Sequence, residues 1–132
     1  MQILLTPQES EDFFHRALCN AVGTGYMEGY GLNFTYNATD YEKAKETLKT
    51  QSISAPAWED VLMQILRQGD VLLVEDYECD GEYNVDITLD MVHDRVRNAP
   101  QEHLMNMYNE DDDAETADVI LQWVAYQEII FG

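Results

Sequence analysis

The stretch that decides the fold runs from Val71 to Leu89 and reads VLLVEDYECDGEYNVDITL. At its centre lies Asp80-Gly81, a dipeptide that favours the type I′ turn of a two-residue β-hairpin. From Tyr83 to Leu89 apolar residues alternate with polar ones, which is the period of a half-buried strand. The sequence therefore predicts a hairpin over 71–89, with one strand on each side of the turn.

Helix signals occupy most of the remaining chain, with one further strand between them. The segment Thr6–Glu9 has the form of a capping box, so a helix is predicted from there to about Val22. Alternation from Tyr30 to Tyr36 predicts a strand. Further helix starts are predicted at Thr39, Ser54, Thr88 and Asp112 or Asp113, with a short helical turn at 104–108. The last helix is expected to bury Ala117, Ile120, Leu121 and Val124. We therefore expect one globular acidic domain over 1–132, of the α+β class, with about three antiparallel strands and helices packed on one side.

The chain is strongly acidic, with 26 Asp and Glu against 7 Lys and Arg and a formal net charge of −19. The segment from Asp70 to Asp118 alone has a net charge of −14. A small domain needs a net charge of roughly 2–8 in magnitude to stay soluble, so solubility does not account for this excess. Self-repulsion costs stability, which indicates that a basic partner uses the charge. Direct binding of nucleic acid or of an anionic membrane is not expected, because phosphate binding needs clustered Lys and Arg.

Cysteine usage and the start of the chain bear on its location. Cys19 and Cys79 form no CxxC pair, which is typical of a reduced, cytoplasmic protein. Cys19 falls on the apolar side of the first predicted helix, and we expect it in the core. The first residues lack a basic region followed by an apolar run, and no stretch has the length of a membrane helix. We therefore expect neither a signal peptide nor a membrane span.

A metal site on the hairpin is one alternative. The pattern Asp76-x-Glu78-x-Asp80-Gly81 is similar to the start of a calcium loop, but Ile87 stands where a bidentate Glu is needed. A two-residue turn would instead place Glu75 directly opposite Asp86. Like charges opposite one another destabilise a sheet, so this face would favour a cation or a basic side chain between them.

No residue set amounts to a catalytic site. The three histidines lack a metal-ligand spacing, and no serine stands in a recognisable nucleophile motif. His93-Asp94 is the one acid–base pair that the sequence suggests, and a surface histidine is the simpler interpretation. We expect no enzyme activity and no cofactor.

The candidate protein-binding residues combine acids with tyrosines, because tyrosine anchors an interface and carboxylates steer association. On the hairpin they are Glu75, Tyr77, Glu78, Asp80, Glu82, Tyr83 and Asp86. In the densest acidic run they are Glu110, Asp111, Asp112, Asp113 and Glu115. We expect the two groups to form one contiguous acidic face, with Tyr77 or Tyr83 as its anchor.

The C-terminal stretch reads DAETADVILQ over 113–122 and EIIFG over 128–132. It resembles the ending of small acidic proteins encoded by phages and prophages, which are mostly uncharacterised. The resemblance implies a viral or prophage origin and an accessory or host-takeover role. Small acidic phage proteins include inhibitors of restriction and CRISPR systems, some of which imitate the charge of DNA.

These observations predict a non-enzymatic acidic protein that binds and occludes a basic, nucleic-acid-handling host protein, as an anti-restriction or anti-CRISPR inhibitor of the DNA-mimic type. B-DNA carries one charge per about 1.7 Å of axis, and we expect a domain this acidic to compete for the same protein groove. One alternative is a small ligand- or metal-binding module, such as a sponge for a signal molecule. Another is a minor phage structural or assembly protein.

Overall fold

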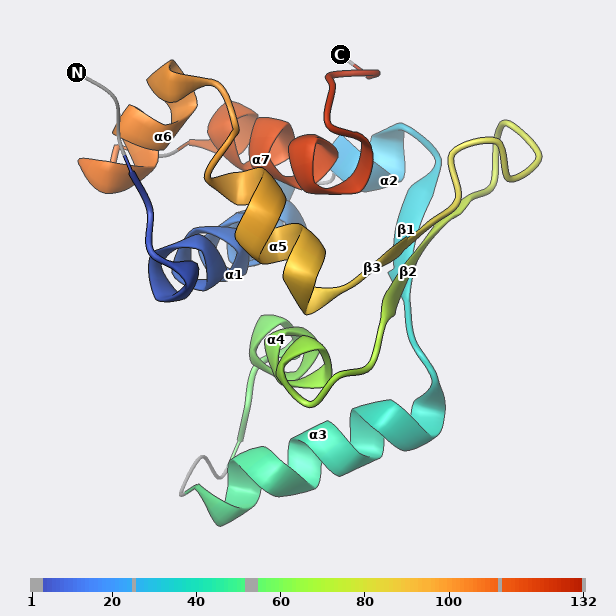
Figure 1. Cartoon of the computed structure of the whole chain (residues 1–132). Helices are drawn as coiled ribbons and strands as arrows, with labels where there is room; N and C mark the ends of the chain where they lie inside the picture. Colours follow the sequence, from blue (N-terminus) through green and yellow to red (C-terminus); the bar gives the residue numbers. More distant parts are fainter. Residues whose placement is uncertain (1–3, 25, 52–54, 112, 132) are drawn as a thin grey trace.

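The computed structural model describes residues 4–24, 26–51, 55–111 and 113–131. Figure 1 shows the arrangement of the elements along the chain. The helices are α1 (Pro7–Thr24), α2 (Tyr26–Gly29), α3 (Ala38–Thr50), α4 (Trp58–Arg67), α5 (Leu89–Val96), α6 (Gln101–Tyr108) and α7 (Ala114–Tyr126). The strands are β1 (Leu32–Thr35), β2 (Leu72–Asp76) and β3 (Val85–Ile87).

The three strands form one antiparallel sheet in the order β1-β2-β3, which confirms the predicted α+β class. Helices α1, α5 and α7 pack against one another on one side of the sheet (Figure 1). Helix α4 contacts α1 and β2, and α3 packs against α4 as the outermost element. One face of the sheet therefore supplies the core, and the other carries the candidate site.

The core lies between α7, α1 and the inner face of the sheet. Every residue predicted for the buried stripe of the last helix is buried: Ala117, Ile120, Leu121 and Val124. Phe14 and Leu18 of α1 and Leu72 of β2 are fully buried in the same cluster. Each such large side chain stabilises the fold by about 1.5–3 kcal/mol relative to an exposed one.

Local capping explains where most helices begin. Thr6 and Glu9 form the predicted capping box, since each backbone N–H donates to the other side chain at 3.0 and 3.1 Å. Thr88 caps α5, as predicted. Asp113, one of the two predicted candidates, caps α7. The predicted start of α3 at Thr39 is wrong, because the Asn37 side chain accepts from the Thr39 backbone at 2.8 Å and is itself the cap.

The start of α4 differs from its prediction as well. Ser54 lies outside the described residues, and Ala57 is the residue that precedes the helix. The Asp60 carboxylate accepts a 3.0 Å hydrogen bond from the Ala57 backbone and so satisfies a free N–H group at the helix start.

The hairpin differs from its prediction in register. Asp80 and Gly81 have φ of 54° and 83°, and the Glu82 backbone N–H donates to the Cys79 carbonyl at 3.1 Å, so the tight turn forms as predicted. It lies inside a loop over residues 77–84, however, because β2 ends at Asp76 and β3 begins at Val85.

The two acids expected to oppose each other have different partners. Asp86 pairs with Leu73, whereas Glu75 pairs with Asn33 of β1. The predicted Glu75–Asp86 pair is therefore wrong, and with it the reason to expect a cation between them.

Cys19 is exposed, so its prediction as a core residue is wrong. Its α1 neighbours Ala17 and Leu18 take the buried positions, and Cys19 faces Glu59 at the side of the helix. Among the described residues, no helix combines the length and the apolar character needed to cross a membrane.

Candidate functional site

Asp76 organises the hairpin loop from its base. Its Oδ1 accepts hydrogen bonds from the backbone N–H groups of Glu78 and Cys79, at 3.0 and 2.9 Å, and its Oδ2 accepts from Tyr83 at 3.2 Å. Burial raises the pKa of Asp76, but the three backbone donors outweigh it and hold the pKa below its ordinary value. This carboxylate is therefore committed to shaping the loop and is not part of a binding surface.

The C-terminal part of the chain holds the same loop from the other side. The Tyr126 hydroxyl donates to the Tyr83 carbonyl at 2.8 Å, and the Tyr83 ring meets the Phe131 ring edge-on at 5.1 Å. Tyr83 is therefore part of an aromatic cluster that holds the loop, and an anchoring role for it stays a prediction.

Tyr77 is the exposed aromatic residue of the hairpin. Its side chain is 62% exposed, and its hydroxyl donates to Glu75 at 2.7 Å. This hydrogen bond, together with burial and the Glu75 charge, raises the pKa of Tyr77. The pair presents a phenol and a carboxylate side by side on the outer face of the sheet.

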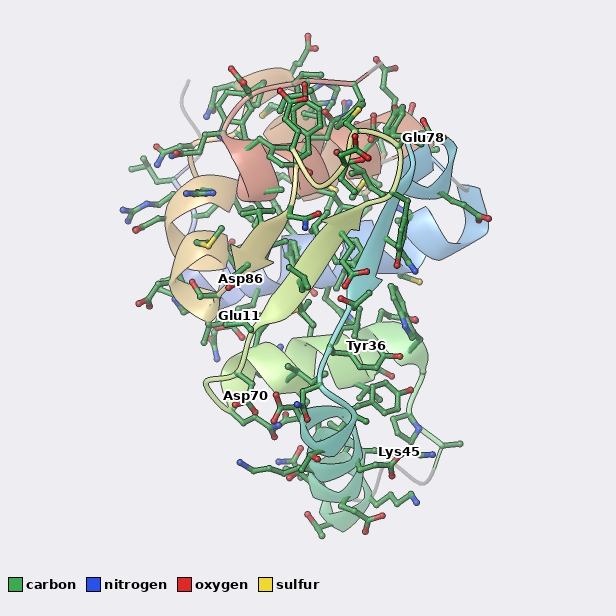
Figure 2. The ribbon with its side chains drawn as sticks, turned by 90° about the vertical axis from the view of Figure 1, so that its right-hand side faces the viewer. Glu11, Tyr36, Lys45, Asp70, Glu78 and Asp86 are labelled. Carbon is green, nitrogen blue, oxygen red and sulfur yellow. The ribbon has the colours of Figure 1, made fainter. Side chains whose placement is uncertain are left out.

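The outer face and the hairpin loop form a surface that we call the acidic sheet face. Its members are Glu75, Tyr77, Glu78, Asp80, Glu82 and Asp86. Figure 2 looks onto this side and shows Glu78 at the loop and Asp86 on β3, whereas Lys45 lies on α3. Within the described part of the chain, no Lys or Arg forms an ion pair with these carboxylates.

The reason lies in where the strands come from. The chain has no Lys or Arg from residue 17 to 42 or from 68 to 94, and these two stretches supply all three strands. The sheet therefore has carboxylates on its surface and no cation of its own to neutralise them.

The second acidic group lies elsewhere. Asp113 caps α7 through a 2.9 Å hydrogen bond from the Thr116 backbone, which lowers the pKa of Asp113. Glu110 has φ of 58° and closes the end of α6. Asp111 and Glu115 are exposed, and Asp112 lies outside the described residues.

These two groups do not form the single face that we expected. The acidic run precedes α7, and Tyr126 near the other end of α7 holds the hairpin loop (Figure 1). A helix of 13 residues is about 20 Å long, so the groups are separated by that length.

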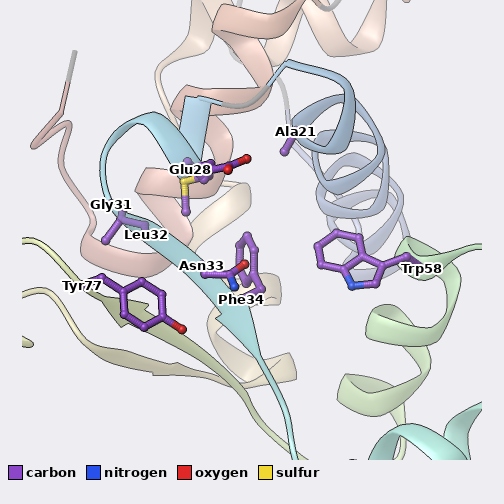
Figure 3. A pocket seen from close by; sticks show the side chains of 9 residues that line it. Ala21, Glu28, Gly31, Leu32, Asn33, Phe34, Trp58 and Tyr77 are labelled. Carbon is purple, nitrogen blue, oxygen red and sulfur yellow. The ribbon is translucent and has the colours of Figure 1, made fainter.

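A groove beside β1 brings Tyr77 together with residues that the sequence did not suggest. It has a volume of about 650 Å³, and Figure 3 shows β1 on one side of it and Trp58 and Ala21 on the other. Its lining residues are Ala21, Met27, Glu28, Gly31, Leu32, Asn33, Phe34, Trp58 and Tyr77. The volume is within the range of ligand-binding pockets. Because the lining comes from α1, α2, β1, α4 and the hairpin loop, periodicity along the chain gives no sign of it.

Ionisable clusters elsewhere connect helices. Glu11 of α1 lies 2.8 Å from Arg67 of α4 and 2.8 Å from His93 of α5. Burial raises the pKa of Glu11, but the hydrogen bonds from Arg67 and His93 outweigh it and lower the pKa. The suggested His93-Asp94 pair is wrong, since Asp94 instead binds Arg97 at 3.0 Å.

The Cys19 thiol is a reactive group outside the acidic sheet face and the groove. Burial and the neighbouring Glu59 raise the pKa of the Cys19 thiol, which is the opposite of what activates a nucleophile. In the ranges that the structure describes, no three His, Cys, Asp or Glu side chains are grouped to hold a metal ion.

Comparison with known proteins adds no relative. No family model, no curated protein and no solved structure matches this chain.

Proposed function

We propose that this chain is a non-enzymatic acidic binding domain whose acidic sheet face binds a basic, nucleic-acid-handling protein and occludes its nucleic-acid site. The observation that carries the proposal is the absence of Lys and Arg from the two stretches that supply the sheet. The carboxylates of this face repel one another in the free protein. A surface rich in Lys and Arg relieves that repulsion on binding.

The charge acts mainly on the rate of association. Potentials of opposite sign steer two proteins together, and this effect falls steeply with ionic strength. Each exposed ion pair contributes only about 0–1 kcal/mol, so affinity needs several pairs together with an apolar anchor. Tyr77 is the exposed aromatic side chain placed to provide that anchor.

The class of partner follows from the charge of the acidic sheet face, which is complementary to a surface rich in Lys and Arg. Proteins that bind nucleic acid present clustered Lys and Arg. A sheet surface that has carboxylates and no Lys or Arg is complementary in charge to such a cluster. The C-terminal resemblance to small phage and prophage proteins narrows the proposal to a host defence protein, such as a restriction or CRISPR effector. The domain would then act as an inhibitor.

The test compares two immobilised baits in a bacterial lysate. One is the native chain, and the other is the variant Glu75→Gln/Glu78→Gln/Glu82→Gln/Asp86→Asn, which keeps side-chain shape and removes charge. We expect the native bait to retain a nucleic-acid-binding protein that duplex DNA displaces. The variant should bind it at least tenfold more weakly, which is about 1.4 kcal/mol.

A matched control separates this face from net charge. The variant Glu42→Gln/Glu46→Gln/Asp94→Asn/Glu102→Gln removes the same charge from α3, α5 and α6. It should lose much less affinity than the sheet variant. Equal binding by the native and sheet-variant baits, or simultaneous binding of the retained protein to DNA and to this chain, contradicts the proposal.

A further inference from the structure

We infer that the free edge of β1 and the groove beside it bind an extended basic segment, which adds to the sheet as a fourth strand. This inference rests on the proposed function, because the segment belongs to the same basic partner. It goes further by naming the backbone conformation and the side-chain pattern of what is bound.

The first observation is the orientation of the β1 backbone. The Tyr77 N–H donates to the Gly31 carbonyl at 2.8 Å, and the register continues through Asn33 opposite Glu75. Hydrogen-bonded and non-bonded positions alternate in an antiparallel pair. Leu32 and Phe34 therefore direct their N–H and C=O groups away from β2.

That side of β1 has no strand partner in the described part of the chain, since the sheet order places β1 at an edge. An unpaired edge is a template on which an extended peptide forms main-chain hydrogen bonds. The groove lies along this edge, between β1 and the residues Ala21 and Trp58 (Figure 3). Leu32 and Phe34 both line it, with 2% and 7% of their surface exposed.

The second observation is the difference between the two sides of the groove. On the core side, the rings of Phe34 and Trp58 meet edge-on at 6.3 Å, and Met27 lines the same groove. On the outer side lie Asn33 and the exposed Tyr77 with its Glu75 partner. Successive side chains of a strand point to opposite faces. An added strand therefore needs apolar residues that alternate with residues suited to a carboxylate-rich face.

The third observation is charge. Glu28 lines the groove, and Glu78 packs over Gly31 at its end. No Lys or Arg occurs from residue 17 to 42, the stretch that forms α2 and β1. The polar positions of the added strand are therefore Lys or Arg. A second copy of this chain is disfavoured as the occupant, since its net charge of −19 would be repelled.

The probe is the acetylated and amidated peptide Lys-Val-Lys-Leu-Lys-Val-Lys, added to isotope-labelled protein. We expect the amide protons of Leu32 and Phe34 to exchange at least tenfold more slowly with the peptide bound. A control peptide with the same side chains and N-methyl groups on alternate amides should bind at least tenfold more weakly. Equal binding of the two peptides overturns strand addition.

Charge reversal tests the location. Glu28 is exposed, so the variant Glu28→Lys is expected to fold. It should bind the Lys peptide at least tenfold more weakly than the native chain does. It should instead bind the corresponding peptide Glu-Val-Glu-Leu-Glu-Val-Glu. The matched control Glu42→Lys changes net charge equally on α3, away from the groove, and should bind the Lys peptide nearly as the native chain does. Equal weakening by both variants overturns the groove as the site.

Two further outcomes separate this inference from the proposed function. If the peptide slows amide exchange at Leu32 and Phe34 but the lysate yields no partner that DNA displaces, the proposed function fails and the groove inference is upheld. If the partner binds the Glu28→Lys and Trp58→Ala variants with native affinity but binds the sheet variant more weakly, the groove inference fails and the proposed function stands. If the protein self-associates and the Leu32 and Phe34 amides are protected from exchange without any peptide, the occupant of the groove is not a basic segment.

Discussion

The hydroxyl of Tyr126 donates a 2.8 Å hydrogen bond to the backbone carbonyl of Tyr83, so the last helix holds the hairpin loop in place. The C-terminal tail completes the contact, because the Phe131 ring lies against both tyrosine rings. Gln122 holds that tail, accepting from the Phe131 N–H at 2.9 Å and donating to its carbonyl at 3.0 Å. The acidic sheet face therefore depends on residues near the end of the chain.

Replacing Tyr126 by Phe should lower the free energy of unfolding by about 1–2 kcal/mol, because a partly buried carbonyl loses its donor. Chemical denaturation followed by circular dichroism measures this. Tyr108→Phe is the control, since Tyr108 is 61% exposed and such a change should stay within about 0.5 kcal/mol. Equal effects of the two substitutions would show that the hydrogen bond contributes nothing.

Tyr126 should also titrate late. Burial, with contributions from Asp76 and Tyr83, raises the pKa of Tyr126 to about 12 from its ordinary value of 10.0. A raised pKa means that its contribution to stability is complete below pH 10 and is lost as the pH rises toward 12. An absorbance titration of tyrosinate should show a late step that Tyr126→Phe removes, and persistence of that step in the variant contradicts the assignment.

Asp118 should make stability fall as the pH rises. Burial raises the pKa of Asp118 above its ordinary 3.8, against the opposing hydrogen bonds from Tyr30 and Gln122. The folded state therefore holds the proton longer, and stability is lost as the pH rises from about 3.8 through the folded pKa.

The measurement is the difference in unfolding free energy between Asp118→Asn and the native chain, followed with pH by urea denaturation. The difference should shift in favour of the variant as the pH rises through this window. Groups with lowered pKa, such as Asp113 and Glu11, act in the opposite direction in both proteins and cancel. A difference that does not depend on pH would show that Asp118 ionises without cost.

Gly31→Ala should destabilise the fold more than Gly69→Ala. Both glycines have positive φ, 78° and 93°, at which an alanine is strained by about 1–2 kcal/mol. A Cβ at position 69 meets open space, whereas one at position 31 would lie 2.8 Å from the Glu78 side-chain carboxyl carbon. The excess should be about 1 kcal/mol or more, as for other overpacked sites. Glu78→Gly should remove most of it, because the Glu78 Cβ would itself lie 2.9 Å from the added methyl group. Equal losses for the two glycines would show that Glu78 moves aside freely.

Added salt should stabilise the native chain, because it screens the repulsion that a net charge of −19 produces. Thermal melts from low to moderate sodium chloride measure the rise in Tm. The rise should be smaller in the sheet variant Glu75→Gln/Glu78→Gln/Glu82→Gln/Asp86→Asn than in the matched control from α3, α5 and α6. Identical salt responses in the two variants would show that repulsion is not concentrated on the acidic sheet face.

The sequence by itself determined the fold class, the tight turn at Asp80-Gly81, and the caps at Thr6 and Thr88. For the last helix it left two candidate caps, and the structure has Asp113 in that role. The turn and the caps depend on residues within one or two turns of each other, so local composition is enough to predict them. The same is true of the buried stripe of α7, which follows from helical spacing.

Only the tertiary structure decided the register of the hairpin and the make-up of the site. Asp76 captures three backbone N–H groups of the loop and ends β2 before the turn, which moves Glu75 away from Asp86. Tyr83 and Tyr77 were equivalent candidates in the sequence. In the structure, the Tyr83 ring packs against Tyr126 and Phe131, whereas Tyr77 is 62% exposed. The groove forms only when β1 lies beside α1 and α4. It could not be predicted from the sequence, because packing between distant segments leaves no periodic pattern along the chain.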